Sequence, residues 1–445
     1  MNKFDVIVIG AGPGGYEAAA MAAADGLATL LIERDALGGT CLNRGCIPTK
    51  ALCRSAQVAT DVASAATYGI RTDSPAWHAD LSVMVSRKEM ILGRLREAVD
   101  TVTAGCTKIF GEASLCAPDT VEVAGERYTA PKIIIATGSA PATLPIPGAE
   151  LCVDSTFMLS LEELPESLAV IGGGVIGMEF ASIFSAFGTK VTVIEYCKEI
   201  LPPFDADIAK RLRTAMKNRG VTFCTSSAVT EVSASDDGTR TVTYESKGKV
   251  KTVDARMVLM AVGRKAMIPP CAPGVELKTG RRGIEVDEQY RTSLPGVYAI
   301  GDCNGQCMLA HAASAQAAVV MGRKVNMEVM PAAVFTHPEC AMAGLTQEEC
   351  EARAIPFRAV KTLFRGNGKA LAMDETDGMV KLLLTTPDDG SEPRIHGCHI
   401  CGPHAADLIT EAALAISAGL PASAIAATIH AHPTLSEVLL AATRQ

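Results

Sequence analysis

The sequence lacks the features of several classes of protein. It has no apolar stretch that approaches the roughly 20 uninterrupted residues of a membrane span, and Asp407 and Glu411 interrupt its C-terminal apolar region. It also has no long run of charge of one sign, and 41 basic against 49 acidic residues give a net charge of −8. Nucleic-acid binding needs a basic surface. We therefore expect a soluble protein that binds neither a membrane nor nucleic acid.

Fifteen cysteines are present, but they are scattered over 445 residues and do not have the density of a small disulfide scaffold. The segment Phe4 to Ile9 reads as a strand directly after Met1-Asn2-Lys3, without a secretory leader. Both features favour a reducing compartment. We expect a cytoplasmic protein, or a mitochondrial matrix protein if the chain is a processed eukaryotic one, with about three domains for this length.

The N-terminal segment has the pattern of a dinucleotide-binding site. A predicted strand at residues 6–9 leads into Gly10-Ala11-Gly12-Pro13-Gly14-Gly15, and a helix at 16–25, a strand at 28–32 and Glu33 follow. In this pattern Gly10 permits a tight turn, Gly12 lets the backbone approach the pyrophosphate, and Gly15 lets the helix pack on the strand. The helix N-terminus attracts the phosphates, and the acid accepts hydrogen bonds from a ribose.

The same pattern recurs in the middle of the chain. A strand at 169–171 leads into Gly172, Gly174 and Gly177, followed by a helix at 178–187, a strand at 190–194 and Glu195. In both copies the acid lies 18 residues after the third glycine. Two dinucleotide sites in one chain indicate electron transfer between two cofactors.

Glu195 also bears on which nicotinamide dinucleotide binds. A carboxylate here repels a 2′-phosphate, and the neighbours Tyr196 and Cys197 supply no arginine. The sequence therefore predicts NAD rather than NADP.

Cys41 and Cys46 lie in a glycine-containing segment directly after the first nucleotide pattern. Five residues of extended chain span roughly 17 Å, whereas a disulfide needs Cα atoms within about 7 Å. A bond between them would therefore require a tight turn or a distorted helix start. Cysteines near a helix N-terminus react as thiolates, so this pair is a candidate redox centre, with two ordinary buried thiols as the alternative.

These features, with further strings along the chain, resemble the two-cysteine, FAD-dependent pyridine nucleotide-disulfide reductase family over essentially the whole length. Within the family the resemblance is closest to the branch that oxidises dihydrolipoyl groups with NAD. The matching strings are residues 37–50, 136–139, 261–264, 295–302, 308–311, 375–378, 402–405 and 430–437.

The resemblance implies an α/β fold with two Rossmann-like domains, for FAD and NAD, and a C-terminal α+β dimerisation domain. It places an FAD-binding domain at 1–148, an NAD-binding domain at 149–262, a central segment completing the FAD domain at 263–331, and the interface domain at 332–445. The residues from 331 onward carry no nucleotide pattern.

The resemblance also assigns roles. Cys41 is implied to be the thiol that exchanges with the lipoyl group, and Cys46 the thiol nearer the flavin, where it forms a charge-transfer complex when reduced. Lys50 and Glu179 are implied to be a buried ion pair beside the flavin. The implied FAD contacts are Gly111, Thr137, Gly138, Ser139, Asp302, Met308, Leu309, Ala310 and His311, and Gly263 falls where the nicotinamide nucleotide passes.

His432 resembles the proton acceptor of the family, oriented by Glu437. A dithiol must lose protons before it attacks a disulfide, and a histidine beside a carboxylate suits that task near neutral pH. In the family this pair comes from the other subunit, which implies a homodimer with shared active sites. The implied substrate carrier is a lipoyl-bearing protein or domain of a 2-oxo acid dehydrogenase complex or of the glycine cleavage system. His430 has no such partner in the string and is interpreted as structural.

Four other cysteines are interpreted as structural. Cys398 and Cys401 form a CxxC motif near several histidines, but a structural zinc site needs four convergent ligands, so we expect core packing and no metal. Cys303 and Cys307 follow Asp302 and are not expected to join a redox relay. Residues 312–317 depart from the family, which more often has Glu-Gly there; this affects packing near the flavin but no reacting group.

Three alternatives stay open. A glutathione-type reductase usually has an NADP site, which Glu195 opposes. Mercuric reductases typically replace the histidine and end in a further cysteine pair, whereas this chain has His432 and ends in Thr443-Arg444-Gln445. The third is a flavoprotein that serves as a structural or sensing subunit with incidental turnover.

Overall fold

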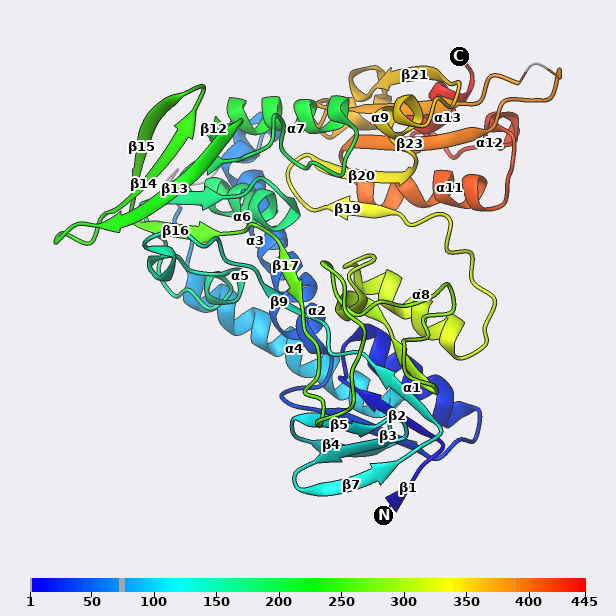
Figure 1. The fold of residues 1–445 in the computed structure, drawn as a ribbon. Helices are drawn as coiled ribbons and strands as arrows, with labels where there is room; N and C mark the ends of the chain where they lie inside the picture. The colour runs from blue at the N-terminus through cyan, green and yellow to red at the C-terminus, as the bar shows by residue number, and fades with distance from the viewer. Residues whose placement is uncertain (1, 72–76, 388) are drawn as a thin grey trace.

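The computed structural model describes residues 2–71, 77–387 and 389–445. Figure 1 shows an N-terminal unit at the bottom, a second unit at the upper left and a C-terminal unit at the upper right. The long helices α3 (Cys46–Ser64) and α4 (Leu81–Val102) run from the first unit toward the second. Among the described residues, no helix is both long enough and apolar enough to cross a membrane.

The N-terminal unit is built on a parallel sheet. Its strand order is β18-β8-β2-β3-β4, and every residue of β2 is buried, as expected for a parallel sheet covered on both faces. Helices α1 (Pro13–Ala24) and α8 (Ala310–Val320) pack beside each other. The strands are β2 (Val6–Ile9), β3 (Thr29–Glu33), β4 (Thr107–Phe110), β8 (Lys132–Ile135) and β18 (Val297–Ala299). Because β18 pairs with β8, the chain after residue 263 returns to the first sheet.

A second, smaller sheet belongs to the same unit and has the order β1-β7-β6-β5. Its strands are β1 (Asn2–Lys3), β5 (Ala113–Ala117), β6 (Thr120–Val123) and β7 (Glu126–Thr129). The short helix α2 (Gly39–Arg44) leads directly into α3.

The second unit repeats the parallel pattern in the order β12-β11-β10-β16. The strands are β10 (Ser167–Ile171), β11 (Lys190–Ile194), β12 (Thr222–Cys224) and β16 (Met257–Met260), with helices α5 (Ser155–Met158), α6 (Val175–Ala186) and α7 (Ala206–Asn218). An antiparallel sheet extends from it, with strands β13 (Ser227–Ala234), β14 (Arg240–Ser246) and β15 (Lys249–Ala255). Strands β9 (Ser139–Pro141) and β17 (Arg264–Ala266) pair antiparallel where the chain crosses between the two units.

The C-terminal unit is an antiparallel sheet with the order β19-β20-β23-β22-β21, covered by helices. The strands are β19 (Ala332–Val334), β20 (Glu339–Gly344), β21 (Arg358–Leu363), β22 (Met379–Leu384) and β23 (Ile395–Gly402). The helices are α9 (Gln347–Ala352), α10 (Gly368–Ala372), α11 (Ala405–Ser417), α12 (Ala422–Ala427) and α13 (Glu437–Thr443). The predicted fold class, two Rossmann-like units with a C-terminal α+β unit, is confirmed.

The helices that follow the two glycine loops, α1 and α6, both begin earlier than predicted. Helix α1 begins at Pro13 rather than at residue 16, and α6 begins at Val175 rather than at residue 178. In both copies the end of the glycine loop forms the first helical turn. In α1 this is favoured by Pro13, because the φ angle of proline suits a helix and its missing N–H would have no partner at the first helical position. The exposed N–H groups of both helices therefore begin within the glycine loops, where a phosphate would bind.

Candidate active site

A single cavity of about 1680 Å³ connects the two glycine loops, the cysteine pair and the start of α8. The predicted residues that line it are Gly10, Gly12, Gly15, Glu33, Cys41, Cys46, Lys50, Gly111, Thr137, Gly138, Ser139, Gly172, Gly174, Glu179, Glu195, Gly263, Asp302, Met308, Leu309, Ala310 and His311. The structure thus brings together residues from both nucleotide patterns around one space.

The first and third glycines of each pattern are required by close packing. A Cβ on Gly10 would lie 2.3 Å from the Ala136 carbonyl oxygen, and one on Gly15 would lie 1.8 Å from the Gly10 oxygen. In the second copy, a Cβ on Gly172 would lie 2.4 Å from the Ala261 oxygen. Gly177 packs in the same way, its added Cβ 2.0 Å from the Gly172 oxygen. Unlike Gly15, Gly177 is not part of the cavity lining.

The two acids make equivalent contacts. Glu33 accepts hydrogen bonds from the N–H groups of Ala11 (2.7 Å) and Asp35 (2.9 Å). Glu195 accepts them from Gly173 (2.5 Å) and Cys197 (2.6 Å). Burial raises the pKa of Glu33, while the hydrogen bond from the Ala11 N–H acts in the opposite direction. Each carboxylate is thereby held at the carboxyl end of its strand, facing the cavity.

The lining fits two dinucleotides. Among the described residues, a Cβ on Gly138, Gly174 or Gly263 would meet no atom within 4 Å, and one on Gly12 would meet only Gly39 Cα, at 4.0 Å. These glycines line the cavity, so the space beside their backbone is open to a ligand. The residues present therefore suit FAD at the first loop and a nicotinamide dinucleotide at the second.

The cysteine pair spans the junction of α2 and α3. Cys41 lies within α2, Gly45 joins the two helices, and Cys46 is the first residue of the 19-residue α3. A Cβ on Gly45 would lie 2.9 Å from the Thr40 oxygen and 3.4 Å from Cys41 Cα, so the chain doubles back tightly against Cys41. This is the distorted helix start that a bond between the two cysteines requires.

The two thiols have different acidities. The Cys41 thiol donates a hydrogen bond to Cys46, and this bond lowers the pKa of Cys46 to about 7, with help from Lys50 and against the effect of burial. The same hydrogen bond, with burial, raises the pKa of Cys41. Cys46 is thus the member of the pair that is stabilised as a thiolate.

Lys50 and Glu179 form the predicted ion pair. Lys50 Nζ lies 2.9 and 3.0 Å from the two carboxylate oxygens of Glu179. Burial acts to lower the pKa of Lys50, but the Glu179 carboxylate raises it, so the cation is retained. Phe335 completes the site, because its N–H donates to Glu179 at 3.0 Å and its ring lies 4.5 Å from Lys50 Nζ. Phe335 was missed from the sequence, where nothing links it to position 179.

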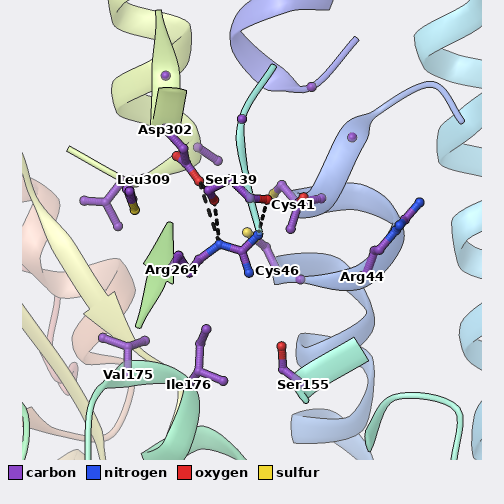
Figure 2. A pocket seen from close by; sticks show the side chains of 18 of the residues that line it. Cys41, Arg44, Cys46, Ser139, Ser155, Val175, Ile176, Arg264, Asp302 and Leu309 are labelled. Atoms are coloured by element: carbon purple, nitrogen blue, oxygen red, sulfur yellow. Dashed lines mark hydrogen bonds and ion pairs between the residues drawn. The ribbon is translucent and has the colours of Figure 1, made fainter. Parts of the chain in front are cut away.

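Arg264 is a second lining residue that the site prediction omitted. Figure 2 shows its guanidinium between the cysteine pair and Asp302. Its Nε donates to Ser139 Oγ at 2.7 Å, another of its nitrogens donates to the Ser139 carbonyl at 2.8 Å, and Asp302 lies 3.9 Å away. The signal was available, because Arg264 directly follows Gly263 in a string already matched to the family.

Gln316 holds the Asp302 segment in place. Its buried side-chain oxygen accepts hydrogen bonds from the Gly301 N–H at 2.7 Å and from the Asn304 amide at 2.9 Å. The departure from the family pattern at residues 312–317 thus supplies a neutral acceptor behind Asp302, and it leaves Asp302 on the cavity wall.

His432 and Glu437 contact each other as predicted but lie outside the cavity lining of the described chain. His432 Nδ1 lies 3.0 Å from Glu437 Oε1, and the other carboxylate oxygen accepts the Thr434 N–H at 2.8 Å. The Thr434 and His432 hydrogen bonds lower the pKa of Glu437. The His432 side chain is 78% exposed. A single chain therefore does not bring His432 to Cys41.

His430, which was interpreted as structural because the local string holds no partner for it, has a carboxylate partner from outside that string. Its Nε2 lies 2.9 Å from Glu411 Oε1, and its Nδ1 lies 3.0 Å from the Thr428 oxygen. The partner comes from α11, 19 residues away, so the local string did not contain it.

Of the remaining cysteines that had been singled out, Cys303, Cys398 and Cys401 are buried and Cys307 is partly buried. Cys398 and Cys401 lie in β23 with no exposed surface. Burial raises the pKa of Cys303 to about 12 and raises that of Cys307, which disfavours thiolate chemistry beside Asp302. Among the described residues, no group of three or more His, Cys, Asp and Glu side chains is arranged to hold a metal ion.

Comparison with known families gives two matches that together cover most of the chain. Residues 4–317 match the family model described as pyridine nucleotide-disulphide oxidoreductase. Residues 330–443 match the dimerisation domain of the same family.

Individual relatives agree with these matches. The chain is 39% identical to a dihydrolipoyl dehydrogenase of Geobacillus stearothermophilus and 38% identical to one of Chlamydia pneumoniae, covering 98% of this chain and 95% of each relative. Among solved structures, it superposes on the HOCl-induced flavoprotein disulfide reductase RclA of Escherichia coli with a TM-score of 0.86 and 27% identity, over 99% of both chains. A Cu(II) complex of that reductase gives a TM-score of 0.85.

Proposed function

Because the chain belongs to the pyridine nucleotide-disulphide oxidoreductase family, we propose that it oxidises protein-bound dihydrolipoyl groups to the disulfide, with NAD as acceptor, through Cys41, Cys46 and FAD. The observation that carries this proposal is the single cavity whose wall holds both the cysteine pair and the two glycine loops of the dinucleotide patterns. The dihydrolipoyl dehydrogenases to which the chain is 35 to 39% identical support the choice of substrate.

In the proposed reaction, the first thiol of the dihydrolipoyl group loses its proton to His432 and attacks the sulfur of Cys41 in the Cys41–Cys46 disulfide. A mixed disulfide forms with Cys41, and Cys46 leaves as the thiolate. The second lipoyl sulfur then displaces Cys41, and the proton of the second lipoyl thiol passes to the released Cys41 sulfur. This releases the lipoyl disulfide and leaves Cys41 as a thiol and Cys46 as a thiolate. Bound FAD supplies the two-electron chemistry between this dithiol and NAD.

The surroundings of Cys46 suit it as the leaving thiolate. It lies at the N-terminus of α3, whose partial positive charge favours an anion. The Lys50 ammonium acts in the same direction. Once both cysteines are reduced, the hydrogen bond from the Cys41 thiol stabilises the Cys46 thiolate further. Glu179 holds Lys50 in place, so the cation remains beside the site throughout turnover.

Glu195 supports NAD as the acceptor. Its carboxylate is fixed on the cavity wall by two backbone N–H groups. In this position it would accept the hydroxyls of an adenosine ribose and repel a 2′-phosphate. Its neighbours Tyr196 and Cys197, which also line the cavity, carry no positive charge.

The dimerisation domain indicates a homodimer, and we propose that each His432–Glu437 pair serves the cavity of the partner chain. The exposure of His432 away from its own cavity supports this arrangement. A lipoyl-bearing protein or domain of a 2-oxo acid dehydrogenase complex or of the glycine cleavage system would then deliver the substrate to the mouth of the site.

We further propose that the protein acts in a reducing compartment, the bacterial cytoplasm or the mitochondrial matrix of a eukaryote. The bacterial sources of several relatives support the first choice. Cell fractionation followed by immunodetection would test this localisation, and recovery in a secreted or periplasmic fraction would contradict it.

An anaerobic experiment tests the activity. The purified flavoprotein is mixed with dihydrolipoamide while the flavin spectrum is followed, and NAD is then added with NADP as the control. We expect flavin reduction with a long-wavelength band that collapses as NADH forms, and no reaction with NADP. If NADH reduces the flavin but dihydrolipoamide does not, the substrate assignment fails, and glutathione disulfide and Hg²⁺ become the next substrates to test.

A further inference from the structure

A buried ion cluster joins the second unit to the C-terminal unit. The Nζ of Lys381, on β22, lies 3.0 and 2.8 Å from the two carboxylate oxygens of Asp205 and 2.7 Å from Asp207. Asp205 precedes α7 and Asp207 lies in its first turn. The side chain of Lys381 is 1% exposed and that of Asp205 is not exposed at all. Figure 1 shows α7 running alongside the C-terminal sheet.

The cluster is held from both sides. Asp205 also accepts the N–H of Asp207 at 3.1 Å and that of Gln347 at 3.3 Å, so it caps α7 and touches the start of α9. On the sheet, Lys381 is the cross-strand neighbour of Lys361 and of His399. Lys361 Nζ lies 2.8 Å from Asp207 Oδ2 and forms no ion pair with Asp205 in the described structure. The Lys361 side chain is 47% exposed.

Asp205 ends a segment that forms part of the proposed NAD site. The segment at residues 196–204, which lies between Glu195 and Asp205, is here termed the nucleotide wall. Tyr196, Cys197, Pro202 and Pro203 of this wall line the cavity. Near its middle the wall is attached to the glycine loop, because the Leu201 N–H donates to the Gly173 oxygen at 2.8 Å.

The attachment at the far end of the nucleotide wall is the buried cluster. Asp205 directly follows the wall, and a carboxylate without exposed surface requires a compensating charge. Lys381 supplies that charge from the C-terminal sheet. Loss of the ammonium would leave Asp205 buried and unpaired, and the simplest relief is movement of Asp205 toward water, which would carry Pro202 and Pro203 with it.

We propose that Lys381 is a positioning residue for the NAD site, which fixes the nucleotide wall through Asp205 so that binding of the adenosine diphosphate half of NAD depends on the C-terminal unit. This inference rests on the proposed function, since it assigns NAD to the second glycine loop. It predicts that the nicotinamide side of the reaction is sensitive to a residue of the dimerisation domain, whereas the dithiol side is not.

The test uses the FAD-loaded dimer with Lys381→Met. The dissociation constant of ADP-ribose for the oxidised protein is measured by calorimetry, KM for NAD by steady-state kinetics, and flavin reduction by dihydrolipoamide in stopped flow. We expect ADP-ribose binding to weaken by about fivefold or more and KM for NAD to rise in parallel, with FAD content and the rate of dihydrolipoamide-driven flavin reduction unchanged.

Lys361→Met is the matched control, because it removes the same charge from the neighbouring strand but leaves Asp205 paired with Lys381. We expect it to change ADP-ribose binding by less than about twofold, as for an exposed ion pair. The inference would be overturned if Lys381→Met bound ADP-ribose as tightly as the unmodified protein, or if both variants weakened that binding equally. It would also be overturned if Lys381→Met slowed the NAD and dihydrolipoamide half-reactions to the same extent.

Asp205→Asn keeps the test decisive if Lys381→Met does not fold. The amide oxygen can still accept the N–H groups of Asp207 and Gln347, whereas the charge that attracts Lys381 is removed. Weakened ADP-ribose binding with retained FAD would support the proposal, and unchanged binding would overturn it. If the unmodified protein binds neither ADP-ribose nor NAD, the proposed NAD site itself is wrong and the inference falls with it.

Discussion

The proposed catalytic residues form two groups, one around Cys46 and one around His432, and the two groups lie in very different surroundings. Cys46, Lys50 and Glu179 come from helices far apart in sequence, yet they meet on the wall of one cavity within a single chain. His432 and Glu437 are close in sequence and contact each other, but the histidine is largely exposed and lies away from that cavity. The difference supports the proposal that the groups that exchange electrons come from one chain, whereas the proton acceptor His432 comes from a second copy.

The largest expected effect comes from removing Cys46, through which electrons pass from the dithiol to the flavin in the proposed reaction. Cys46→Ser should reduce dihydrolipoamide oxidation by roughly 1000-fold or more, because no disulfide can form. NADH should still reduce the flavin, since the second nucleotide site is untouched. Steady-state assays and anaerobic titration with NADH measure the two activities.

Cys53→Ser is the matched control for that variant. Cys53 lies on the same helix, and its thiol donates to the Phe335 oxygen at 3.3 Å, a contact that a serine hydroxyl can keep. Turnover in Cys53→Ser should stay within about twofold of the unmodified protein. Substantial dihydrolipoamide oxidation by Cys46→Ser would refute the role given to the pair.

The next effect comes from removing the proton acceptor. His432→Gln should slow dihydrolipoamide oxidation by about 100-fold or more, the usual contribution of a general base. His404→Gln serves as the control, because His404 is also an exposed histidine near a carboxylate, 3.6 Å from Asp407, and we expect it to remain active. Stopped-flow reduction by dihydrolipoamide isolates the affected step.

Hybrid dimers sharpen the comparison between the two groups. A dimer of one Cys46→Ser chain and one His432→Gln chain contains one intact site if His432 serves the partner's cavity, and none if it serves its own. Mixing and refolding the two inactive variants should therefore restore activity, to about half of the unmodified value for each hybrid dimer. Hybrids isolated with two different affinity tags and found inactive would rule out the shared site.

The smallest effect concerns the acidity of Cys46. Its pKa is lowered to about 7, so in the reduced protein the thiolate is present above that pH and is lost as the pH falls below it. Lys50 contributes to this lowering, so Lys50→Met should move the titration to higher pH, by up to about one unit. The pH dependence of the long-wavelength absorbance, or of alkylation by iodoacetamide, measures the shift.

Arg44→Met is the control for this titration. Arg44 also carries a positive charge and lies between the two cysteines in sequence, but it forms an ion pair with Asp35 and is not among the main causes of the lowered pKa of Cys46. Its removal should leave the titration unchanged. A similar shift in both variants would show that any nearby cation acts on Cys46 and that Lys50 has no special position.

Local patterns in the sequence were sufficient for much of the fold and site. The glycines at 10, 12 and 15 and the acid at 33 are constrained by one strand–turn–helix unit, and the second copy repeats those constraints. The contact between His432 and Glu437 was also predictable, because the two residues lie five positions apart. Helix starts were displaced by three residues, since the glycine loops join the first helical turns.

Contacts between distant segments were not predictable in the same way. Phe335 reaches Glu179 across 156 positions, and Glu411 reaches His430 from another helix. The Lys381 cluster joins residues 174 to 176 positions apart, and no sequence motif singled out Lys381. No local periodicity encodes such pairs, because they depend on how complete units pack together.

The sequence by itself determined the two Rossmann-like units, their glycine loops and acids, and the cysteine pair, because each depends on backbone geometry within a few dozen residues. Only the tertiary structure decided that these parts share one cavity, that Phe335 contacts Glu179 and Gln316 holds the Asp302 segment, and that a buried charge joins Asp205, at the end of the nucleotide wall, to the C-terminal sheet. The physical reason is that burial and pairing of charge are properties of the packed chain, and they arise only when distant segments exclude water from one another.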